Sequence, residues 1–212
     1  MKRVVIVGAG PAGLFAADEL AGSFDVVVLE QRGRVGGSGL VIDGKFNYHP
    51  RIGGDLTEFL SEEEAWMVIE KIDDAFKRYS ISDDYYDEEK LDELERKAMI
   101  AGVRFIKIKQ KHVGSDRLPG VMERFRHDLE EKGVRFELNT RATDLRAVGG
   151  RVTKVLTDKG SVGCDFVLLA PGRSGHSWLK GQYDKLGLEV DFNPLDVGVR
   201  VEVRNEVMKE VV

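Results

Sequence analysis

The sequence predicts an α/β fold built on a mainly parallel β-sheet, and three observations near its start support this. Residues 4–7 and residues 26–29 are each four consecutive apolar residues, which is typical of strands buried on both faces of a parallel sheet. Between these runs, Leu14, Ala17 and Leu20 recur at helical spacing. A strand, a helix and a second strand in this order predict a βαβ unit, the repeating element of α/β folds.

The segment between the first predicted strand and the helix is rich in glycine. Residues 8–13 read GAGPAG and match the pattern G-x-G-x-x-G. In a dinucleotide-binding unit, Gly8 would make the tight turn, Gly10 would let a diphosphate reach the backbone, and Gly13 would let helix and strand pack closely. The start of the helix adds unpaired N–H groups and the positive end of its dipole. The pattern therefore predicts a diphosphate site at this turn.

An acidic residue follows the second predicted strand. Glu30 lies 22 residues after Gly8, close to the spacing of about 20 expected for an acid that binds the adenosine ribose. A carboxylate here would repel a 2′-phosphate, so NADP is disfavoured, although Arg32 and Arg34 weaken this exclusion slightly. The alternative is a glycine turn without a ligand in an ordinary α/β domain. The order of strand, turn, helix, strand and acid favours a nucleotide site.

A second glycine-rich segment comes directly after this acid. Residues 33–39 contain four glycines in seven positions, which is incompatible with a packed helix or strand. In a doubly wound fold, the loop after the second strand lies at the same sheet edge as the first glycine turn. This position favours a ligand-contacting loop over a plain turn.

Composition excludes several classes of protein. Of the 212 residues, 42% are hydrophobic and 33% charged, with a net charge of −5, and acidic and basic residues are interspersed. The sequence contains no block of basic residues, which argues against a nucleic-acid-binding surface. The apolar run at the N-terminus is too short for a membrane span or a signal peptide, so a cytoplasmic protein is expected. Cys164 is the single cysteine, which excludes a redox-active cysteine pair and favours an inert buried thiol. No metal site is expected.

Further along the chain, five motifs occur in an order that resembles a known family. They are GAGPAG with its following E and RVGG, then GGSGLVIDGKFNYHP, KHVGSD, LLAPGRSGHSWL and NPLDVGVRVEV. Together they resemble the FAD-dependent, NAD(FAD)-utilising dehydrogenase family of the flavoproteins of the glutathione-reductase structural type. The resemblance covers nearly the whole chain. It implies a Rossmann-like FAD-binding domain, and it implies that the chain corresponds to the N-terminal half of such a protein.

The resemblance also implies which residues contact the cofactor. The second glycine pair would run beside the diphosphate and ribityl chain, and the strand that ends in Ala-x-Gly would let the backbone pass close to FAD. The implied cofactor-binding residues are Gly8, Gly10, Pro11, Ala12 and Gly13 at the diphosphate, Glu30 at the adenosine ribose, Gly36, Gly37 and Ser38 on the ribityl side, Ala142 at the adenine edge, and Ala170 and Gly172 at the closing strand. Gln31, next to Glu30, is also expected to contact the cofactor.

The remaining segments predict further elements of this domain and a second, incomplete α+β domain that interrupts it. In chain order, we expect helices over residues 61–79 and 88–101, a strand over 103–108, a helix over 118–129, strands over 134–138, 151–157, 160–164 and 166–169, and a two-sided strand over 197–203. Residues 1–45 and 113–175 are predicted to form the FAD-binding domain. Residues 46–112 and 176–212 are predicted to form a partial substrate or cap domain. Lys45 and His49 follow the glycine loop and are catalytic candidates, with a solvated loop as the alternative.

The function expected from these observations is an FAD-dependent oxidoreductase, or its N-terminal FAD-binding half. Its substrate and electron donor are left open, with NAD(P)H as one candidate donor and a homo-oligomer or a complementary chain as candidate partners. One alternative is a non-catalytic nucleotide-binding module or a truncated half that needs a partner chain. Another is an NAD-binding dehydrogenase domain, against which the Gly36–Gly37 pair and the Ala170-x-Gly172 strand end count, because a simple NAD domain needs neither.

Overall fold

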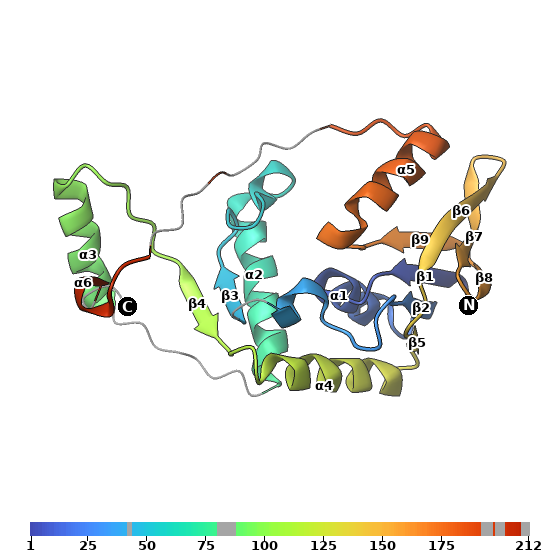
Figure 1. Ribbon diagram of the computed structural model, residues 1–212, viewed down its shortest axis with the longest axis horizontal. Helices are drawn as coiled ribbons and strands as arrows, with labels where there is room; N and C mark the ends of the chain where they lie inside the picture. Colours follow the sequence, from blue (N-terminus) through green and yellow to red (C-terminus); the bar gives the residue numbers. More distant parts are fainter. Residues whose placement is uncertain (42–43, 80–87, 192–196, 198–201, 209–212) are drawn as a thin grey trace.

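The computed structural model describes residues 1–41, 44–79, 88–191, 197 and 202–208. Its largest sheet is a parallel sheet of four strands in the order β5-β2-β1-β9 (Figure 1). The strands are β1 (Arg3–Val7), β2 (Asp25–Leu29), β5 (Arg135–Glu137) and β9 (Phe166–Leu169). In β1, Val7 pairs with Leu29 of β2 and with Leu169 of β9. The carboxyl ends of these strands therefore meet at one edge, and the predicted α/β fold with a parallel sheet is confirmed.

Helices cover one face of this sheet. α1 (Pro11–Leu20) follows β1, and α4 (Leu118–Glu131) leads into β5 (Figure 1). The predicted apolar stripe of α4 is buried along its whole length, and Phe125 contacts Phe15 of α1 edge-on, with ring centroids 5.3 Å apart. The core on this side contains Val4, Ile6, Leu14, Ala17, Val26, Val28, Val121, Met122, Phe125 and Leu129.

A second, antiparallel sheet covers the other face. It has the order β6-β7-β8, and its strands are β6 (Ala142–Val148), β7 (Arg151–Thr157) and β8 (Gly160–Gly163). Leu145 and Val155 pack against Val5, Val7 and Val27 of the parallel sheet. Because successive side chains of a strand point to opposite faces of the sheet and both faces are covered, every residue of β1 and β2 except the first is buried.

A segment between the glycine loop and α4, here called the excursion, carries a two-stranded ribbon and further helices. β3 (Lys45–Tyr48) pairs with β4 (Lys109–His112) in an antiparallel ribbon. The other elements of the chain are the 3-10 helices η1 (Gly37–Val41), η2 (Leu56–Glu58) and η3 (Arg173–Gly175) and the helices α2 (Glu62–Lys77), α3 (Glu88–Ile100), α5 (His176–Leu186) and α6 (Asn205–Met208). α2 begins with the expected capping box, in which Glu64 N donates to Ser61 Oγ and Ser61 N donates to Glu64 Oε2.

The excursion has a charged centre. Asp73 of α2 and Lys111 of β4 are both buried, at 3% and 1% exposure, and form an ion pair of 2.6 Å. Lys109 Nζ lies 2.8 Å from the other carboxylate oxygen of Asp73. Burial raises the pKa of Asp73, but the interactions with Lys109 and Lys111 outweigh burial and lower this pKa to about 2. The two lysines therefore keep the buried carboxyl ionised.

One predicted strand was wrong, and another lies outside the described residues. Residues 103–108 are irregular, and the strand begins only at Lys109. The apolar side chains of this alternating pattern do not pack against a sheet, since Val103 and Ile106 are 59% and 47% exposed. The two-sided strand predicted over 197–203 falls mainly on residues 198–201, which the structure does not describe.

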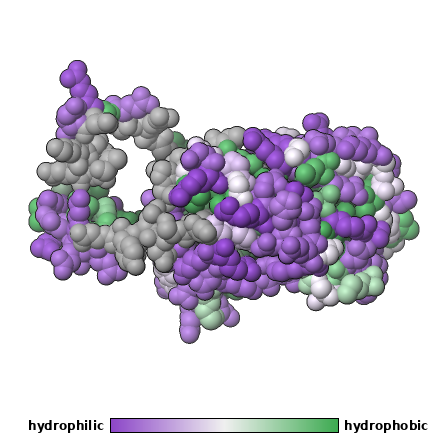
Figure 2. All heavy atoms as spheres, turned by 90° about the horizontal axis from the view of Figure 1, so that it is seen from below, coloured by the Kyte–Doolittle hydropathy of each residue, from purple (hydrophilic) through white to green (hydrophobic). Residues whose placement is uncertain are grey.

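The far end of the excursion is separate from the parallel sheet. Figure 1 shows α3 and α6 together at the end of the molecule opposite the sheet, and no residue of α3 is buried in the described part of the chain. The face drawn in Figure 2 is mainly hydrophilic, with hydrophobic side chains in separate patches. Among the described residues, no helix is long and apolar enough to cross a membrane. The domain boundaries given above stay a prediction.

Candidate functional site

The first glycine turn is held between three strand ends. Gly8 N donates a hydrogen bond of 2.8 Å to Leu29 O of β2, and Ala170 N donates one of 2.8 Å to Val7 O of β1. Gly8 has a φ of +105°, and a Cβ atom there would lie 2.2 Å from Ala170 O. A side chain at this position would push the turn away from the end of β9, so the fold itself requires Gly8.

Gly13 is also required by the fold, whereas Gly10 is not. A Cβ atom at Gly13 would lie 1.9 Å from Gly8 O, because α1 packs directly on the turn. At Gly10, φ is −74°, and apart from chain neighbours the one described atom within 4 Å of an added Cβ is Gly37 Cα, at 3.9 Å. Space for a side chain therefore exists at Gly10. The absence of a side chain at this position has no explanation in the packing of the described residues.

The second glycine loop packs against the first turn, as the sequence predicts. Gly36 N donates to Ala9 O over 2.8 Å, and a Cβ atom at Gly37 would lie 3.1 Å from Gly10 Cα. Gly36 and Gly37 have positive φ angles of +111° and +60°, which glycine adopts without strain. The loop then enters η1 (Gly37–Val41), where Ser38 is exposed.

Glu30 lies at the carboxyl end of β2 and points at the turn. Its side chain is 7% exposed, and each carboxylate oxygen accepts one backbone hydrogen bond. Oε2 accepts from Ala9 N and Oε1 from Arg32 N, both at 2.9 Å. Since a carboxylate oxygen can accept two hydrogen bonds, Glu30 keeps acceptor capacity for a bound molecule while its orientation is set by the backbone.

A pocket of about 380 Å³, here called the strand-end pocket, opens beside Glu30. Of the residues predicted to bind a cofactor, Gly8, Glu30, Gln31 and Ala142 line it. The rest of its lining was not predicted and comes from the ends of β1 and β2, the segments after β5 and β9, the start of β6, and α5. These residues are Val7, Leu29, Thr140, Arg141, Thr143, Pro171, Ser174, Gly175 and Trp178.

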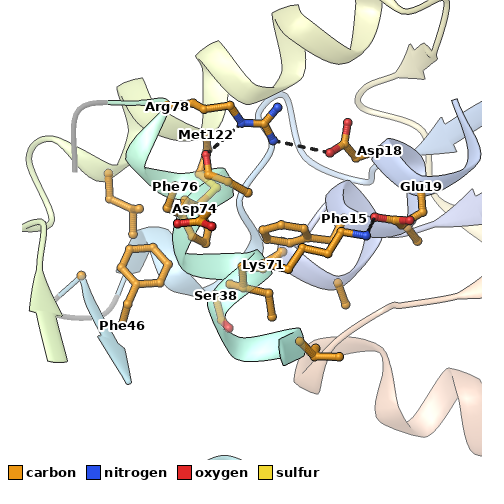
Figure 3. A pocket seen from close by; sticks show the side chains of 18 residues that line it. Phe15, Asp18, Glu19, Ser38, Phe46, Lys71, Asp74, Phe76, Arg78 and Met122 are labelled. Carbon is orange, nitrogen blue, oxygen red and sulfur yellow. Dashed lines mark hydrogen bonds and ion pairs between the residues drawn. The ribbon is translucent and has the colours of Figure 1, made fainter. Parts of the chain in front are cut away.

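A larger pocket of about 980 Å³, here called the helix pocket, lies between α1, α2 and α4. Pro11, Ala12 and Ser38 line it, together with an aromatic wall of Phe15, Phe46 and Phe76. Two ion pairs between α1 and α2 lie on the side away from Phe46 (Figure 3). They join Lys71 to Glu19 at 2.5 Å and Arg78 to Asp18 at 3.6 Å.

The other predicted site residues line neither pocket. Gly10, Gly13, Gly36, Gly37 and Ala170 belong to the glycine turn or contact it, and Gly172 follows Pro171, which lines the strand-end pocket. The strand-end pocket and the helix pocket both reach the segment 8–12, from its two ends. Twelve of the thirteen predicted residues therefore lie at the glycine turn or line one of the two pockets that reach it.

The catalytic candidates are not brought to either pocket by the described residues. His49 accepts a hydrogen bond of 3.1 Å at Nδ1 from Arg51 N, and its ring lies edge-on to Trp66 at 5.5 Å. The side chain of Lys45 is outside the described part of the structure. Among the described residues, no group of three His, Cys, Asp or Glu side chains could hold a metal ion. Burial raises the pKa of the Cys164 thiol, which disfavours the reactive thiolate.

Comparison with known proteins assigns the fold. Residues 6–52 match the family described as NAD(P)-binding Rossmann-like domain. Among solved structures, the chain is similar to L-amino acid deaminase from Proteus vulgaris, with 18% identity and a TM-score of 0.57 over 90% of this chain and 51% of that one. It is also similar to glycine oxidase from Bacillus cereus, with 18% identity and a TM-score of 0.55 over 87% of this chain and 58% of that one.

Two further proteins are also similar to this chain over part of their own length. L-proline dehydrogenase from P. horikoshii is 16% identical, with a TM-score of 0.56 over 90% of this chain and 57% of that one. An uncharacterised protein of Clostridium beijerinckii is 25% identical over 207 residues, which are 97% of this chain and 37% of that protein. The chain therefore spans about half of these solved relatives and a smaller share of the Clostridium protein. At these identities the likeness establishes a Rossmann-like fold.

Proposed function

We propose that this chain binds FAD and forms the nucleotide-binding part of a flavin-dependent oxidoreductase of the glutathione-reductase structural type. The diphosphate would lie on the turn at Gly10, and the adenosine would enter the strand-end pocket beside Glu30. The remainder of the cofactor would follow the loop at Gly36 and Gly37. Bound FAD would supply hydride and electron transfer.

The observation that carries this proposal is the free space at Gly10. Gly8 and Gly13 are glycines because a Cβ atom would collide with backbone at 2.2 and 1.9 Å. Gly10 has an ordinary φ and no such collision, yet it stands at the first turn of α1, where the helix presents its N–H groups. A diphosphate that approaches the backbone gives a reason for glycine at this position.

The residues of the chain have separate roles in this proposal. The Glu30 carboxylate, oriented by Ala9 N and Arg32 N, would accept hydrogen bonds from the ribose hydroxyls. The first turn of α1 would neutralise part of the diphosphate charge. Gly36 and Gly37 would let the chain beyond the diphosphate pass close to the backbone.

An NAD-binding domain is the second candidate, and the matched family description names NAD(P). The glycine loop favours FAD, because Gly36 is tied to Ala9 of the turn and places a second glycine segment beside the diphosphate position. A simple NAD domain needs no such loop. Titrations with FAD, FMN, NADH and NADPH distinguish the candidates, and tight binding of NADH with none of FAD would refute our proposal.

The test of the site is a pair of glycine variants. Gly10→Ala should leave the free energy of unfolding within about 1 kcal/mol, as expected for a change at a helix N-cap. It should weaken FAD binding more than about tenfold, since overpacking a site costs about 1–3 kcal/mol. Gly120→Ala in α4, where an added Cβ meets no described atom within 4 Å, is the matched control and should bind FAD normally. Equal FAD affinities in the two variants would remove the diphosphate from this turn.

This chain spans about half of its solved relatives, and we propose an oxidoreductase activity for the protein to which this nucleotide-binding part contributes. A flavin-dependent oxidoreductase and a non-catalytic FAD-binding module differ in whether a donor reduces the bound flavin. Loss of the visible flavin absorbance under anaerobic conditions reports this reduction. The first donors to test are NADH, NADPH and amino acids, because three solved neighbours are named for the deamination, oxidation or dehydrogenation of amino acids.

A further inference from the structure

Helix α5 is attached to the start of β6 through one of its faces. The indole Nε1 of Trp178 donates a hydrogen bond of 2.9 Å to Thr143 O. Four residues later, Gln182 is buried and its Oε1 accepts from Leu145 N at 3.0 Å. Residues four apart lie on the same side of a helix, so both contacts belong to the side of α5 that meets β6.

A third contact continues this face. Lys185 Nζ lies 2.5 Å from a carboxylate oxygen of Asp144, and position 185 is seven residues beyond Trp178, two turns along the helix. α5 is thus attached at both ends and in the middle to the short segment 143–145. The same segment begins at the strand-end pocket, which Thr143 lines. The attachment therefore sets where the Trp178 ring lies relative to the pocket.

Trp178 lines the strand-end pocket together with Glu30. The indole N–H is bonded to Thr143 O, and the side chain packs against the apolar core between the two sheets. These contacts restrain the ring, which has no other hydrogen-bond donor to offer. What it presents to the pocket is an aromatic surface. The pocket thus combines an acid that accepts hydrogen bonds from hydroxyl groups with a ring that can stack on a planar base.

We propose that Trp178 is the base-binding residue of the strand-end pocket and stacks on the adenine ring of the bound nucleotide. This inference rests on the proposed FAD site and adds to it the residue that recognises the base. The pocket volume of about 380 Å³ lies near the lower end of the range of roughly 300–1,000 Å³ for small-molecule sites. Such a volume suits the nucleoside end of a dinucleotide.

The chain contains two tryptophans, which allows a direct test by fluorescence. In Trp66→Phe, Trp178 is the sole tryptophan, and titration with AMP should quench or shift the tryptophan emission. In Trp178→Phe, Trp66 is the sole tryptophan and lies beside His49, so AMP should leave the tryptophan emission unchanged. If calorimetry detects AMP binding to Trp66→Phe while the Trp178 emission stays constant, the inference is wrong.

Affinity measurements test the aromatic surface itself. Trp178→Leu should weaken the binding of AMP and FAD about tenfold or more, the effect typical of removing an aromatic ring that stacks on a base. Trp178→Phe keeps an aromatic face and should retain most of the affinity. Ribose 5-phosphate carries no base, so its binding should be the same in all three proteins. Equal AMP affinities in the wild type and Trp178→Leu would overturn the proposal.

The variant Gln182→Ala distinguishes stacking by Trp178 from a merely structural role of this residue. This variant removes another attachment of α5 and leaves the ring in place, so a structural role would give AMP affinities as low as those of Trp178→Leu, whereas stacking would give a smaller loss. Different results would refute the inference about Trp178 and the proposed FAD-binding function. Unchanged FAD binding in Trp178→Leu refutes only the inference, whereas a folded Trp66→Phe protein that binds neither AMP nor FAD refutes both.

Discussion

The edge of the parallel sheet and the β3–β4 excursion each bury one carboxylate, but they do so by different means. Glu30 is 7% exposed and accepts hydrogen bonds from the backbone of Ala9 and Arg32. Asp73 is 3% exposed and is ion-paired with Lys109 and Lys111. Neutral donors leave the charge of Glu30 available to a ligand, whereas the lysines neutralise Asp73. This difference supports our proposal that Glu30 serves binding, whereas the ion pairs of Asp73 stabilise its own region.

The two regions also differ in how closely neighbouring backbone segments pack against each other. At the sheet edge, the turn, α1 and β9 leave no room for a Cβ atom at Gly8 or Gly13. In the excursion, α3 has no buried residue in the described structure, and at Gly102 an added Cβ meets no described atom within 4 Å. Stability should therefore respond strongly to changes near the turn and weakly to changes in α3.

The largest expected effect is that of Gly13→Ala. A Cβ atom 1.9 Å from Gly8 O would force α1 away from β1, and we expect a loss of about 4 kcal/mol or more in the free energy of unfolding. Gly102→Ala is the control, with a cost of about 1–2 kcal/mol from its positive φ of +69°. Urea denaturation of both variants measures the difference, and similar values would show that the turn is not closely packed.

Phe125→Ala tests the layer beneath the site. Phe125 is 1% exposed and contacts rings of α1 and of Tyr79, so its truncation should cost about 3–5 kcal/mol. Met99 in α3 is 71% exposed, and Met99→Ala should stay within about 0.5 kcal/mol. Thermal and chemical denaturation would contradict the comparison if the two truncations had equal effects.

The charged centre of the excursion predicts a pH dependence. The pKa of Asp73 falls from an ordinary value of 3.8 to about 2 on folding, so this carboxylate stabilises the fold above about pH 4. Its contribution should decline as the pH falls from about 4 towards 2. Asp73→Asn should be less stable than the wild type by about 3 kcal/mol at neutral pH. The difference in free energy of unfolding between the two proteins should shrink with acid, and a constant difference would exclude Asp73 as its source.

The smallest of these effects should appear in binding. Glu30→Ala removes the acceptor proposed for the ribose and should weaken FAD binding by about 1–3 kcal/mol. Glu89→Ala, which removes an exposed carboxylate from the first turn of α3, is the control and should bind FAD as the wild type does. An unchanged affinity of Glu30→Ala in a titration would remove Glu30 from the site.

Much of the sheet edge could be predicted from the sequence because its constraints are local. The apolar runs of β1 and β2 are continuous because both sheet faces are covered, by α1 and α4 and by β6–β8. The glycine turn follows directly from the geometry at Gly8 and Gly13. Glu30 was found from its spacing, since the length of α1 fixes the distance between the ends of the two strands.

The rest of the site depends on contacts between distant segments. Trp178 reaches the strand-end pocket only because α5 is attached to β6, and no spacing rule connects Trp178 with Glu30. The strand predicted over 103–108 failed for a related reason. Its alternating pattern was correct for a half-buried strand, but the partner of β3 begins at Lys109, where Lys111 meets Asp73 of α2.

The two backbone hydrogen bonds to Glu30 have a consequence for the rate and thermodynamics of ligand capture. Since Ala9 N and Arg32 N already hold the carboxylate, its rotational freedom is lost when the protein folds and not when a ligand arrives. A preorganised acceptor lowers the entropic cost of association. Encounter with a nucleoside should then require little rearrangement at this edge, and amide exchange at Ala9 and Arg32 should be slow even in the ligand-free protein.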